Sequence, residues 1–531
     1  MRRLGGARRL HRAAAAATFR RPAEVPGLPP ARPTYAHLAL VGGATRGHLR
    51  SVVTSAAAGS PAPTPPPAPP LARVPPGTNI LTLLRSRGLL ADVAGEGLEA
   101  AAAAGPLPVY CGFDPTAPSL HLGNLLGIVV LTWFRAAGHT PVALLGGATG
   151  RVGDPSGRSA ERPVLGEADL EANISSIRAI LEDLLTRPGP AEHGPPPLIL
   201  NNHDWFGGVS LLDFLRDVGK FARVGVMLSR DSVRSRMAAD AEGLSFTEFT
   251  YQLLQGYDFV HLARSHGVRV QVGGSDQMGN MVAGLDLLRR LGGVDGKGED
   301  ADGDAAATAS SPGGSSTGCY GLTFPLLTKS DGTKMGKSAS GAVWLAPSQL
   351  SPFKFYQFLL TSVPDEDVIT FLRMLTFLPL EAIAGVEAAM KGEGGAYAPG
   401  DSQRLLAAEV TRFVHGEAGL AQALAATAAL RPGAATVLDA DTLETAAGEG
   451  PSASLPRGEV VGRPLAELMA AVGMQPSKAA VRRMIAGGGV ALNNEKVGDE
   501  GRVVEEGDLI GGRLLLLAAG KKNKMLVRVE G

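Results

Sequence analysis

The feature that most constrains the fold is a strand–helix–strand pattern in the first third of the chain. An apolar run at 107–113 predicts a strand, residues 123–137 follow a helical pattern, and 140–145 form a second apolar run. Similar apolar runs recur at 198–200 and 268–272, with helical patterns between them. This alternation predicts an α/β fold with a doubly wound, mostly parallel sheet. Ligands bind such sheets at the carboxyl ends of the strands.

Length and composition limit the kind of molecule this can be. At 531 residues the chain is too long for one ordinary domain, so we expect two or three. Lysine plus arginine equals aspartate plus glutamate, at 51 each, so the overall charge does not indicate a nucleic-acid partner. Cys111 and Cys319 are too few for a disulfide framework or a metal-ligand cluster, so no protein-bound metal is predicted. No run of 18 uncharged apolar residues occurs, so we expect no membrane span.

Residues 1–75 differ in kind from the rest of the chain. They contain eleven arginines, and Glu24 is their only acidic residue. They are also rich in alanine and end in a proline/alanine tract. This composition predicts an organellar transit peptide, and therefore import into a mitochondrion, a chloroplast or both. A disordered basic tail that acts on RNA is the alternative.

Changes in composition divide the remainder of the chain. We predict a catalytic α/β domain with a Rossmann-like sheet at 76–345, a helical domain at 346–447 and a small α+β domain at 462–531. We predict a linker at 448–461, because residues 448–456 are mostly glycine, alanine, serine and proline. Residues 293–318 have no apolar periodicity and predict a flexible surface insertion.

Basic residues gather on a predicted helix at 477–486 and near the C-terminus. They are Lys478, Arg482, Arg483, Lys521 and Lys522. Arginines on one helix face with a lysine cluster nearby can bind the phosphates of structured RNA. A solvated charged face is the alternative.

A turn and a helix start follow the first predicted strand. The helix begins near His121-Leu122-Gly123-Asn124, where free backbone amides favour anions. Gly123 leaves room for a ligand to approach the backbone, and His121 can donate a hydrogen bond to a phosphate oxygen. A histidine at a helix start is often structural, so the phosphate role depends on other groups that accompany it.

Two lysines in a loop are the second candidate for phosphate binding. Lys334 and Lys337 stand in a segment of small and polar residues that ends in Ser338. Their ammonium groups can neutralise the charge that builds on a phosphorus centre and on departing pyrophosphate. Arg158 and Arg162, in another loop rich in glycine and proline, are further candidates for pyrophosphate contacts.

A third set of polar residues lies on a predicted helix. Ser245 and Glu248 form a capping-box pattern that starts this helix at residue 246. Tyr251, Gln255 and Asp258 then fall at i, i+4 and i+7, on one face of it. This face meets either solvent or a polar pocket. Asp258 stands between large apolar side chains and needs a partner if it is buried.

These segments resemble the signatures of a known enzyme class. Residues 121–124 and 334–338 resemble the HIGH and KMSKS motifs of class I aminoacyl-tRNA synthetases. Tyr-Cys-Gly-Phe-Asp-Pro-Thr at 110–116, Gly-Asp-Pro-Ser-Gly at 153–157 and Gly-Gly-Ser-Asp-Gln at 273–277 narrow the resemblance to the tyrosyl-tRNA synthetase family, bacterial or organellar type. The resemblance extends from about residue 79 to the end of the chain.

The resemblance implies an activity and its partners. Members of this family use Mg²⁺-ATP to convert L-tyrosine into tyrosyl-adenylate with release of pyrophosphate, and then transfer the tyrosine to tRNA(Tyr). The resemblance also implies a homodimer, an anticodon-binding role for the helical domain, and RNA binding by an S4-like C-terminal domain.

The resemblance further implies roles for individual residues. Tyr110 and Asp258 would hold the tyrosine phenol. The tyrosine-binding set as a whole is Tyr110, Asp154, Tyr251, Gln255, Asp258, Gln271 and Gln277. The ATP-binding set is Cys111, Gly112, Asp114, Thr116, His121, Gly123, Asn124, Asp276, Lys334, Lys337 and Ser338. The catalytic residues would be Thr116, His121, Asn124, Lys334 and Lys337.

Two positions depart from the family signatures. Asn124 stands where HIGH has its second histidine, and its amide can still donate a hydrogen bond at any pH. Gly336 stands at the first serine of KMSKS, which loosens the loop but keeps both lysines. Three other interpretations stay open: a tryptophanyl-tRNA synthetase, an RNA-binding or splicing scaffold derived from a synthetase, and a nucleotidyltransferase of the same superfamily.

Overall fold

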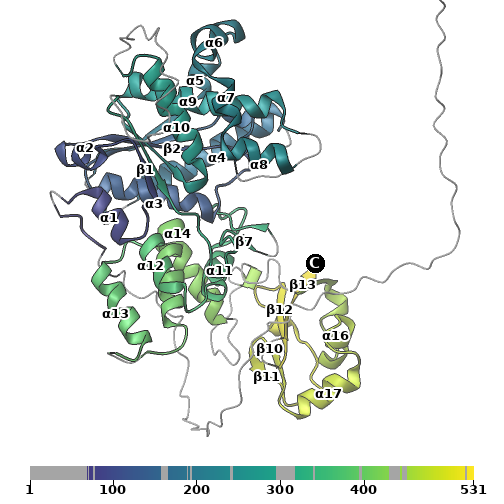
Figure 1. Cartoon of the computed structure of the whole chain (residues 1–531). Coiled ribbons are helices and arrows are strands. Elements are labelled where there is room, and N and C mark those ends of the chain that lie inside the picture. The colour runs from purple at the N-terminus through teal and green to yellow at the C-terminus, as the bar shows by residue number, and fades with distance from the viewer. Residues whose placement is uncertain are drawn as a thin grey trace, which may run out of the picture. The chain divides into compact units, whose positions relative to one another are not determined.

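The computed structural model describes most of the chain. The described residues are 69, 71–75, 78–156, 165–187, 189–191, 194–239, 243–294, 317–338, 341–393, 397–429, 440, 443–444, 451–520 and 523–530. The predicted transit peptide and the predicted insertion at 293–318 lie almost entirely outside these residues. Helices and strands carry the labels of Figure 1.

A six-stranded sheet forms the centre of the α/β part. Its strands are β1 (Asp92–Ala94), β2 (Pro108–Phe113), β3 (Thr140–Leu145), β4 (Leu198–Asn201), β5 (Val270–Gly274) and β6 (Tyr320–Phe324). They lie in the order β1-β6-β5-β2-β3-β4, and all neighbours are parallel except β1 and β6. The predicted α/β class with a mostly parallel sheet is confirmed.

Helices cover both faces of this sheet (Figure 1). The chain crosses the sheet in one direction from β2 through α3 (Leu122–Ala136) to β3, and through α4 (Glu167–Thr186) to β4. From β5 it crosses in the opposite direction through α10 (Met278–Arg290) to β6. Because parallel crossovers are right-handed, α10 lies on the other face from α3 and α4. The direction reverses between β2 and β5, which is where such sheets bind ligands.

Several shorter helices complete the α/β part. They are α1 (Ile80–Ser86), α2 (Leu98–Ala104), α5 (His203–Phe206), α6 (Leu211–Asp217), α7 (Val224–Leu228) and α8 (Asp231–Ala239), and the longer α9 (Phe246–His266) leads to β5. Ser245 caps α9 as predicted, because its side chain accepts from the backbone nitrogen of Glu248. The capping box is not closed. The Glu248 carboxylate is buried and accepts from Arg236 Nε at 3.0 Å, since a buried charge needs a charged partner.

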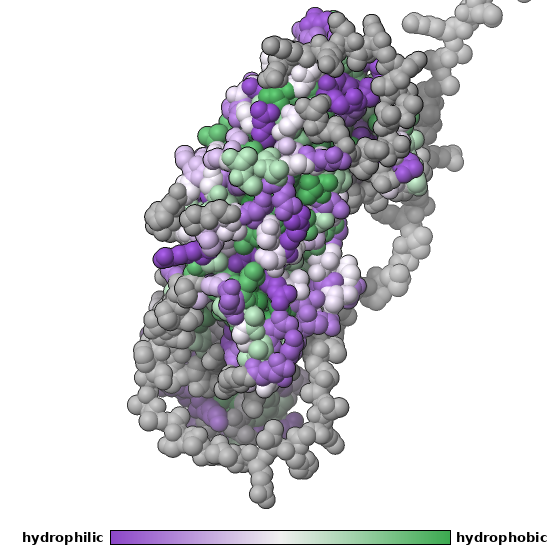
Figure 2. Space-filling view, turned by 60° about the vertical axis from the view of Figure 1, so that its left-hand side comes forward, coloured by the Kyte–Doolittle hydropathy of each residue, from purple (hydrophilic) through white to green (hydrophobic). Residues whose placement is uncertain are grey.

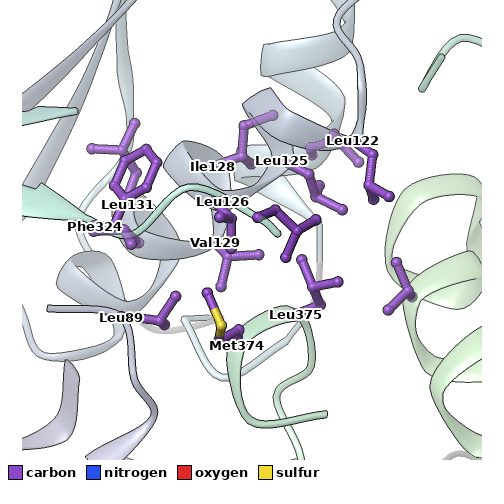
Figure 3. Packing of buried hydrophobic residues seen from close by; sticks show 14 of the residues in the cluster. Leu89, Leu122, Leu125, Leu126, Ile128, Val129, Leu131, Phe324, Met374 and Leu375 are labelled. Carbon is purple, nitrogen blue, oxygen red and sulfur yellow. The ribbon is translucent and has the colours of Figure 1, made fainter. Parts of the chain in front are cut away.

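Helices follow the α/β part in the described residues between 352 and 429. They are α11 (Pro352–Ser362), α12 (Val368–Leu375), α13 (Leu380–Met390) and α14 (Asp401–Ala429). Figure 3 shows Leu125 and Val129 of α3 near Met374 and Leu375 of α12. The helical segment therefore shares one hydrophobic core with the α/β part.

Arg87 fixes the C-terminal end of α12 to the α/β part. Its guanidinium donates to the carbonyls of Arg373, Thr376 and Leu378 at 3.3, 3.2 and 2.6 Å, and it lies 4.1 Å above the ring of Trp133. Burial lowers the pKa of Arg87 to about 10, so it stays charged at neutral pH. A cation in this place compensates the partial negative charge of the helix end.

Residues 451–530 form a second sheet with its own core. Its strands lie in the order β11-β10-β12-β13-β9, and its helices are α16 (Leu465–Ala471) and α17 (Lys478–Ala486). The strands are β9 (Ser452–Pro456), β10 (Val490–Leu492), β11 (Glu495–Lys496), β12 (Leu514–Ala519) and β13 (Asn523–Glu530). The predicted linker at 448–461 is wrong for 452–456. These small residues pair in parallel with β13, a distant partner that supplies the order their own composition does not predict.

Among the coloured residues of Figure 2, hydrophilic residues alternate with small hydrophobic patches. Within the described ranges, no helix combines the length and the hydropathy needed to cross a membrane.

Candidate active site

A cavity of about 860 Å³ lies where β2 and β5 end, at the reversal point of the sheet. Most of the predicted site residues line it. They are Tyr110, Cys111, Gly112, Asp114, Thr116, His121, Gly123, Asn124, Asp154, Tyr251, Gln255, Asp258, Gln271, Asp276, Gln277 and Lys334. The side chains of Lys337 and Ser338 lie outside the described part of the structure, and so do Arg158 and Arg162.

The two signature segments lie beside each other at this cavity. The backbone nitrogen of Leu122 donates to Val343 O at 2.8 Å, and Val343 N donates to Gly336 O at 3.0 Å. A Cβ atom at position 336 would lie 3.6 Å from the backbone nitrogen of Gly123. Met335 is fully buried, so it anchors the lysine loop next to the start of α3.

His121 caps the amino end of α3. Its Nδ1 accepts hydrogen bonds from the backbone nitrogens of Gly123 and Asn124, at 3.1 and 3.4 Å. Asn124 Oδ1 in turn accepts from His121 N at 3.1 Å. Because Nδ1 is an acceptor, the proton of neutral His121 lies on Nε2, which can donate to a ligand. Asn124 uses its side-chain oxygen in the cap, so its NH₂ group is the part that can donate to a ligand.

Asp258 is buried and held by two donors. Asn202 Nδ2 donates to its Oδ2 and Trp205 Nε1 donates to its Oδ1, each at 3.0 Å. Burial raises the pKa of Asp258 well above its ordinary value, although the bonds from Asn202 and Trp205 favour the carboxylate. These bonds fix the orientation of the carboxyl group in the cavity.

Three buried polar atoms that line the cavity have no hydrogen-bond partner among the described residues. They are Tyr110 Oη, Gln255 Oε1 and Gln271 Oε1. Burial raises the pKa of Tyr110, so its hydroxyl keeps its proton and can donate. Buried polar atoms without partners are unfavourable unless a ligand or water supplies the missing hydrogen bonds. The cavity is therefore suited to a ligand with several polar groups.

Hydrogen bonds connect the other polar side chains of the cavity. Gln277 Nε2 donates to Asp154 Oδ2 at 2.9 Å, and Gln277 Oε1 accepts from Gln255 Nε2 at 3.2 Å. Tyr251 Oη donates to Asp114 Oδ2 at 2.9 Å. Gln277 thus holds Asp154 and Gln255 in place, and its own contact with a substrate stays a prediction.

The chain matches known families over most of its length. Residues 102–430 match the family model described as tRNA synthetases class I (W and Y), and residues 443–527 match the tyrosine–tRNA ligase SYY-like C-terminal domain. The chain is 51% identical over 456 residues to the chloroplastic/mitochondrial tyrosine–tRNA ligase of Arabidopsis thaliana, which covers 85% of this chain and 84% of that protein. This chain belongs to the class I tyrosyl-tRNA synthetases.

Other relatives agree with this assignment. The synthetase is 47% identical over 452 residues to the tyrosine–tRNA ligase of Protochlamydia amoebophila, with 85% of this chain and 99% of that protein covered. A C-terminally truncated mitochondrial tyrosyl-tRNA synthetase of Aspergillus nidulans has a similar structure, with a TM-score of 0.55 and 33% identity. That similarity covers 66% of this chain and 93% of the other.

The sequence interpretation missed two residues that hold Asp258 in this synthetase. Asn202 directly follows β4, so the rule that ligands gather at the carboxyl ends of strands could have indicated it. Trp205 lies in the short helix α5, where no pattern marks it. Gly146 was also missed. A Cβ atom there would lie 2.0 Å from Asp114 Oδ1, so the loop after β3 can only approach this carboxylate with a glycine.

Cys111 lies on β2 and lines the cavity as a buried thiol. Burial raises its pKa to about 12, so it stays neutral and is at most a weak hydrogen-bond donor. Across the described part of the chain, no group of three or more His, Cys, Asp or Glu side chains could hold a metal ion.

The predicted RNA-binding residues are described in part. Arg482 and Arg483 are exposed on α17, and Lys478 forms an ion pair with Glu467 at 2.7 Å. Lys521 and Lys522 lie outside the described residues. The two arginines are accessible to a phosphate backbone, and RNA binding by this helix stays a prediction.

Proposed function

We propose that this synthetase is a tyrosine–tRNA ligase of organellar protein synthesis. In the first step a carboxylate oxygen of L-tyrosine attacks the α-phosphorus of ATP, and the bond to the bridging oxygen breaks to release pyrophosphate. In the second step a hydroxyl of the terminal adenosine of tRNA(Tyr) attacks the carbonyl carbon of the adenylate, and AMP leaves. Relatives at 41–51% identity carry the name tyrosine–tRNA ligase.

The observation that carries the proposal is the pair of buried groups Asp258 and Tyr110. A phenol hydroxyl can donate to the Asp258 carboxylate and accept from the Tyr110 hydroxyl, whose oxygen has no partner among the described residues. An indole offers one N–H donor and no oxygen, so it would leave one of these groups unpaired. The chemistry of the pocket therefore favours tyrosine over tryptophan, the main alternative substrate.

The remaining tyrosine contacts follow from the family resemblance. Asp154, Tyr251 and Gln255 would bind the α-amino group, with Asp154 as the partner of its positive charge. Gln271 would supply its buried amide oxygen to the substrate.

ATP would bind as its Mg²⁺ complex at the amino end of α3. His121 Nε2 and Lys334 would donate to its phosphates, together with Lys337. Cys111 and Asp276 would contact the ribose. The first step needs no general base, because the tyrosine carboxylate is already a nucleophile. The protein would position the reactants and neutralise charge.

Features near the two ends of the chain support the proposed organellar location and the proposed tRNA partner. The arginine-rich composition of residues 1–75 and the chloroplastic/mitochondrial name of the Arabidopsis relative support an organellar location. The match to the C-terminal domain of tyrosine–tRNA ligases and the exposed Arg482 and Arg483 support contact with tRNA(Tyr).

A homodimer is supported by exposed apolar side chains on the helices between β4 and β5. The most exposed are Leu211, Leu212, Val224, Met237 and Phe246, at 70%, 76%, 60%, 50% and 73%. They stand on four successive helices, α6 to α9, and exposed apolar side chains of this size are typical of an interaction surface. A second copy of the chain would remove them from water.

The Leu212→Arg variant should be a monomer at micromolar concentration, because a charge at this interface would be desolvated without a partner. Size-exclusion chromatography with light scattering measures the mass. Val503→Arg is the matched control, since Val503 is exposed at 37% in the C-terminal unit and should leave the dimer intact. A dimer that survives Leu212→Arg would place the interface elsewhere.

The direct test of the ligase function is charging of a tRNA(Tyr) transcript by the purified protein with ATP. We expect tyrosine on the tRNA and no charging of tRNA(Trp) with tryptophan. Charging with tryptophan would support the tryptophanyl alternative. RNA binding without any charging would support the scaffold alternative.

A further inference from the structure

Hydrogen bonds tie the lysine loop, residues 328–338, to the turn between α11 and α12. The backbone nitrogen of Ser330, at the tip of the loop, donates to both carboxylate oxygens of Asp367, at 3.2 and 3.1 Å. The Ser330 hydroxyl donates to Asp367 Oδ2 at 3.4 Å and also to Glu366 Oε1. One carboxylate therefore holds both the main chain and the side chain of the loop tip.

The outer half of the lysine loop is exposed to solvent. A tight turn forms its tip, closed by bonds from Gly332 N to Lys329 O at 2.9 Å and from Lys329 N to Thr333 O at 2.8 Å. Lys334, which lines the cavity, follows this turn directly. Buried Met335 fixes the loop on the inner side of Lys334, and the bonds to Asp367 fix it on the outer side.

Asp367 is suited to serve as an anchor. It is 8% exposed and directly precedes α12, where an aspartate usually caps the free backbone amides. Here its side chain makes no capping bond, because its oxygens hold Ser330. A helix without a capping bond is less stable than a capped one. The Asp367 carboxylate therefore holds the loop at the expense of the stability of α12.

Helix α12, which begins directly after Asp367, is held in place by contacts at both of its ends. The C-terminal end of α12 is held by Arg87, and Met374 packs against α3 (Figure 3). The turn before α12 is bonded to α14 through Gln403 Nε2, which donates to Asp365 Oδ1 at 2.6 Å. The tie at Asp367 therefore connects an exposed loop to the shared hydrophobic core.

We propose that Asp367 is a positioning residue for tyrosine activation, which holds the lysine loop so that Lys334 meets the phosphates of ATP. The proposal rests on the proposed function, because that function assigns the loop to ATP. Asp367 acts through the loop and touches no substrate. It also makes the helical segment α11–α14 part of the support of the active site.

The first test is the Asp367→Ala variant in tyrosine-dependent ATP–pyrophosphate exchange. We expect kcat to fall about tenfold, because displaced lysines stabilise the transition state less well. KM for tyrosine should stay within about twofold of the unaltered protein, because none of residues 328–333 lines the cavity. Asp401→Ala is the matched control, since it removes a carboxylate at the start of α14 that, among the described residues, contacts only Ala398 N and Arg404, not the loop or the turn before α12, and it should leave kcat unchanged.

A second variant removes the other partner of the same bonds. Ser330→Pro deletes the backbone N–H and the hydroxyl, and proline suits this position, the second residue of the Lys329–Gly332 turn. It should lower kcat as Asp367→Ala does, and the double variant should be no worse than either single variant.

Several outcomes would overturn the proposal. They are a normal kcat for Asp367→Ala, an equal loss for Asp401→Ala, a parallel loss in tyrosine binding, or additive effects in the double variant. An unaltered protein that shows no exchange would instead contradict the proposed function.

Discussion

The His121→Ala variant should show tyrosine-dependent ATP–pyrophosphate exchange lowered by about 10² to 10³, with tyrosine binding nearly unchanged. The removal of one preorganised donor to a charged transition state raises the barrier by about 3–4 kcal/mol. His121 Nε2 is such a donor, because Nδ1 is occupied by the backbone amides of Gly123 and Asn124. The measurements are kcat for exchange and the Kd of tyrosine by equilibrium dialysis.

His121→Ala also removes a helix cap, so a second variant has to separate the two effects. Loss of an N-cap lowers the stability by about 0.5–2 kcal/mol. In His121→Asn, the asparagine oxygen can replace Nδ1 as the cap, but no atom stands where Nε2 was. We expect a melting temperature near that of the unaltered protein and exchange as slow as in His121→Ala. Normal exchange in His121→Asn would mean that His121 acts only as a cap.

The Asp258→Asn variant should lose selectivity for tyrosine. We expect kcat/KM for tyrosine in the exchange reaction to fall by roughly 10²-fold, because a charge-assisted hydrogen bond of about 1.5–3 kcal/mol is lost. Exchange with phenylalanine should change far less, because phenylalanine makes no bond to this carboxylate. A rejection of phenylalanine by about 10⁵ is a known property of tyrosyl-tRNA synthetases, and a buried polar pair left unpaired gives its physical reason.

Trp205→Phe is a milder variant that tests the same carboxylate. It keeps an aromatic ring beside Asp258 and removes the Nε1–H that donates to Oδ1 at 3.0 Å. We expect a loss of about tenfold in kcat/KM for tyrosine, smaller than for Asp258→Asn, because Asn202 still holds the Asp258 carboxylate. Equal losses for tyrosine and phenylalanine in either variant would show that Asp258 supports the fold and does not bind the phenol hydroxyl of the substrate.

The α/β part was predictable because its signals are local. Apolar runs mark β2 and β3, and the amphipathic spacing of Tyr251, Gln255 and Asp258 places them on one face of α9. These residues do meet at one cavity, as the topology of a doubly wound sheet requires.

The features that escaped prediction depend on partners distant in the sequence. Glu248 fits a capping box by spacing, but the buried Arg236 competes for its carboxylate. Strand β9 has small residues that resemble a linker, and only β13 makes it a strand. Trp205 reaches Asp258 across 53 residues of chain, and the tie from Ser330 to Asp367 crosses from a loop to a helix start. No periodicity encodes such contacts.

The most direct test of tyrosine activation at this site is pyrophosphate exchange into ATP by the unaltered protein, measured with tyrosine, tryptophan and phenylalanine at equal concentrations. We expect exchange with tyrosine and at most a trace with the other two, because only a phenol satisfies both Asp258 and Tyr110. Exchange that prefers tryptophan, or no exchange with any of the three amino acids, would contradict this expectation.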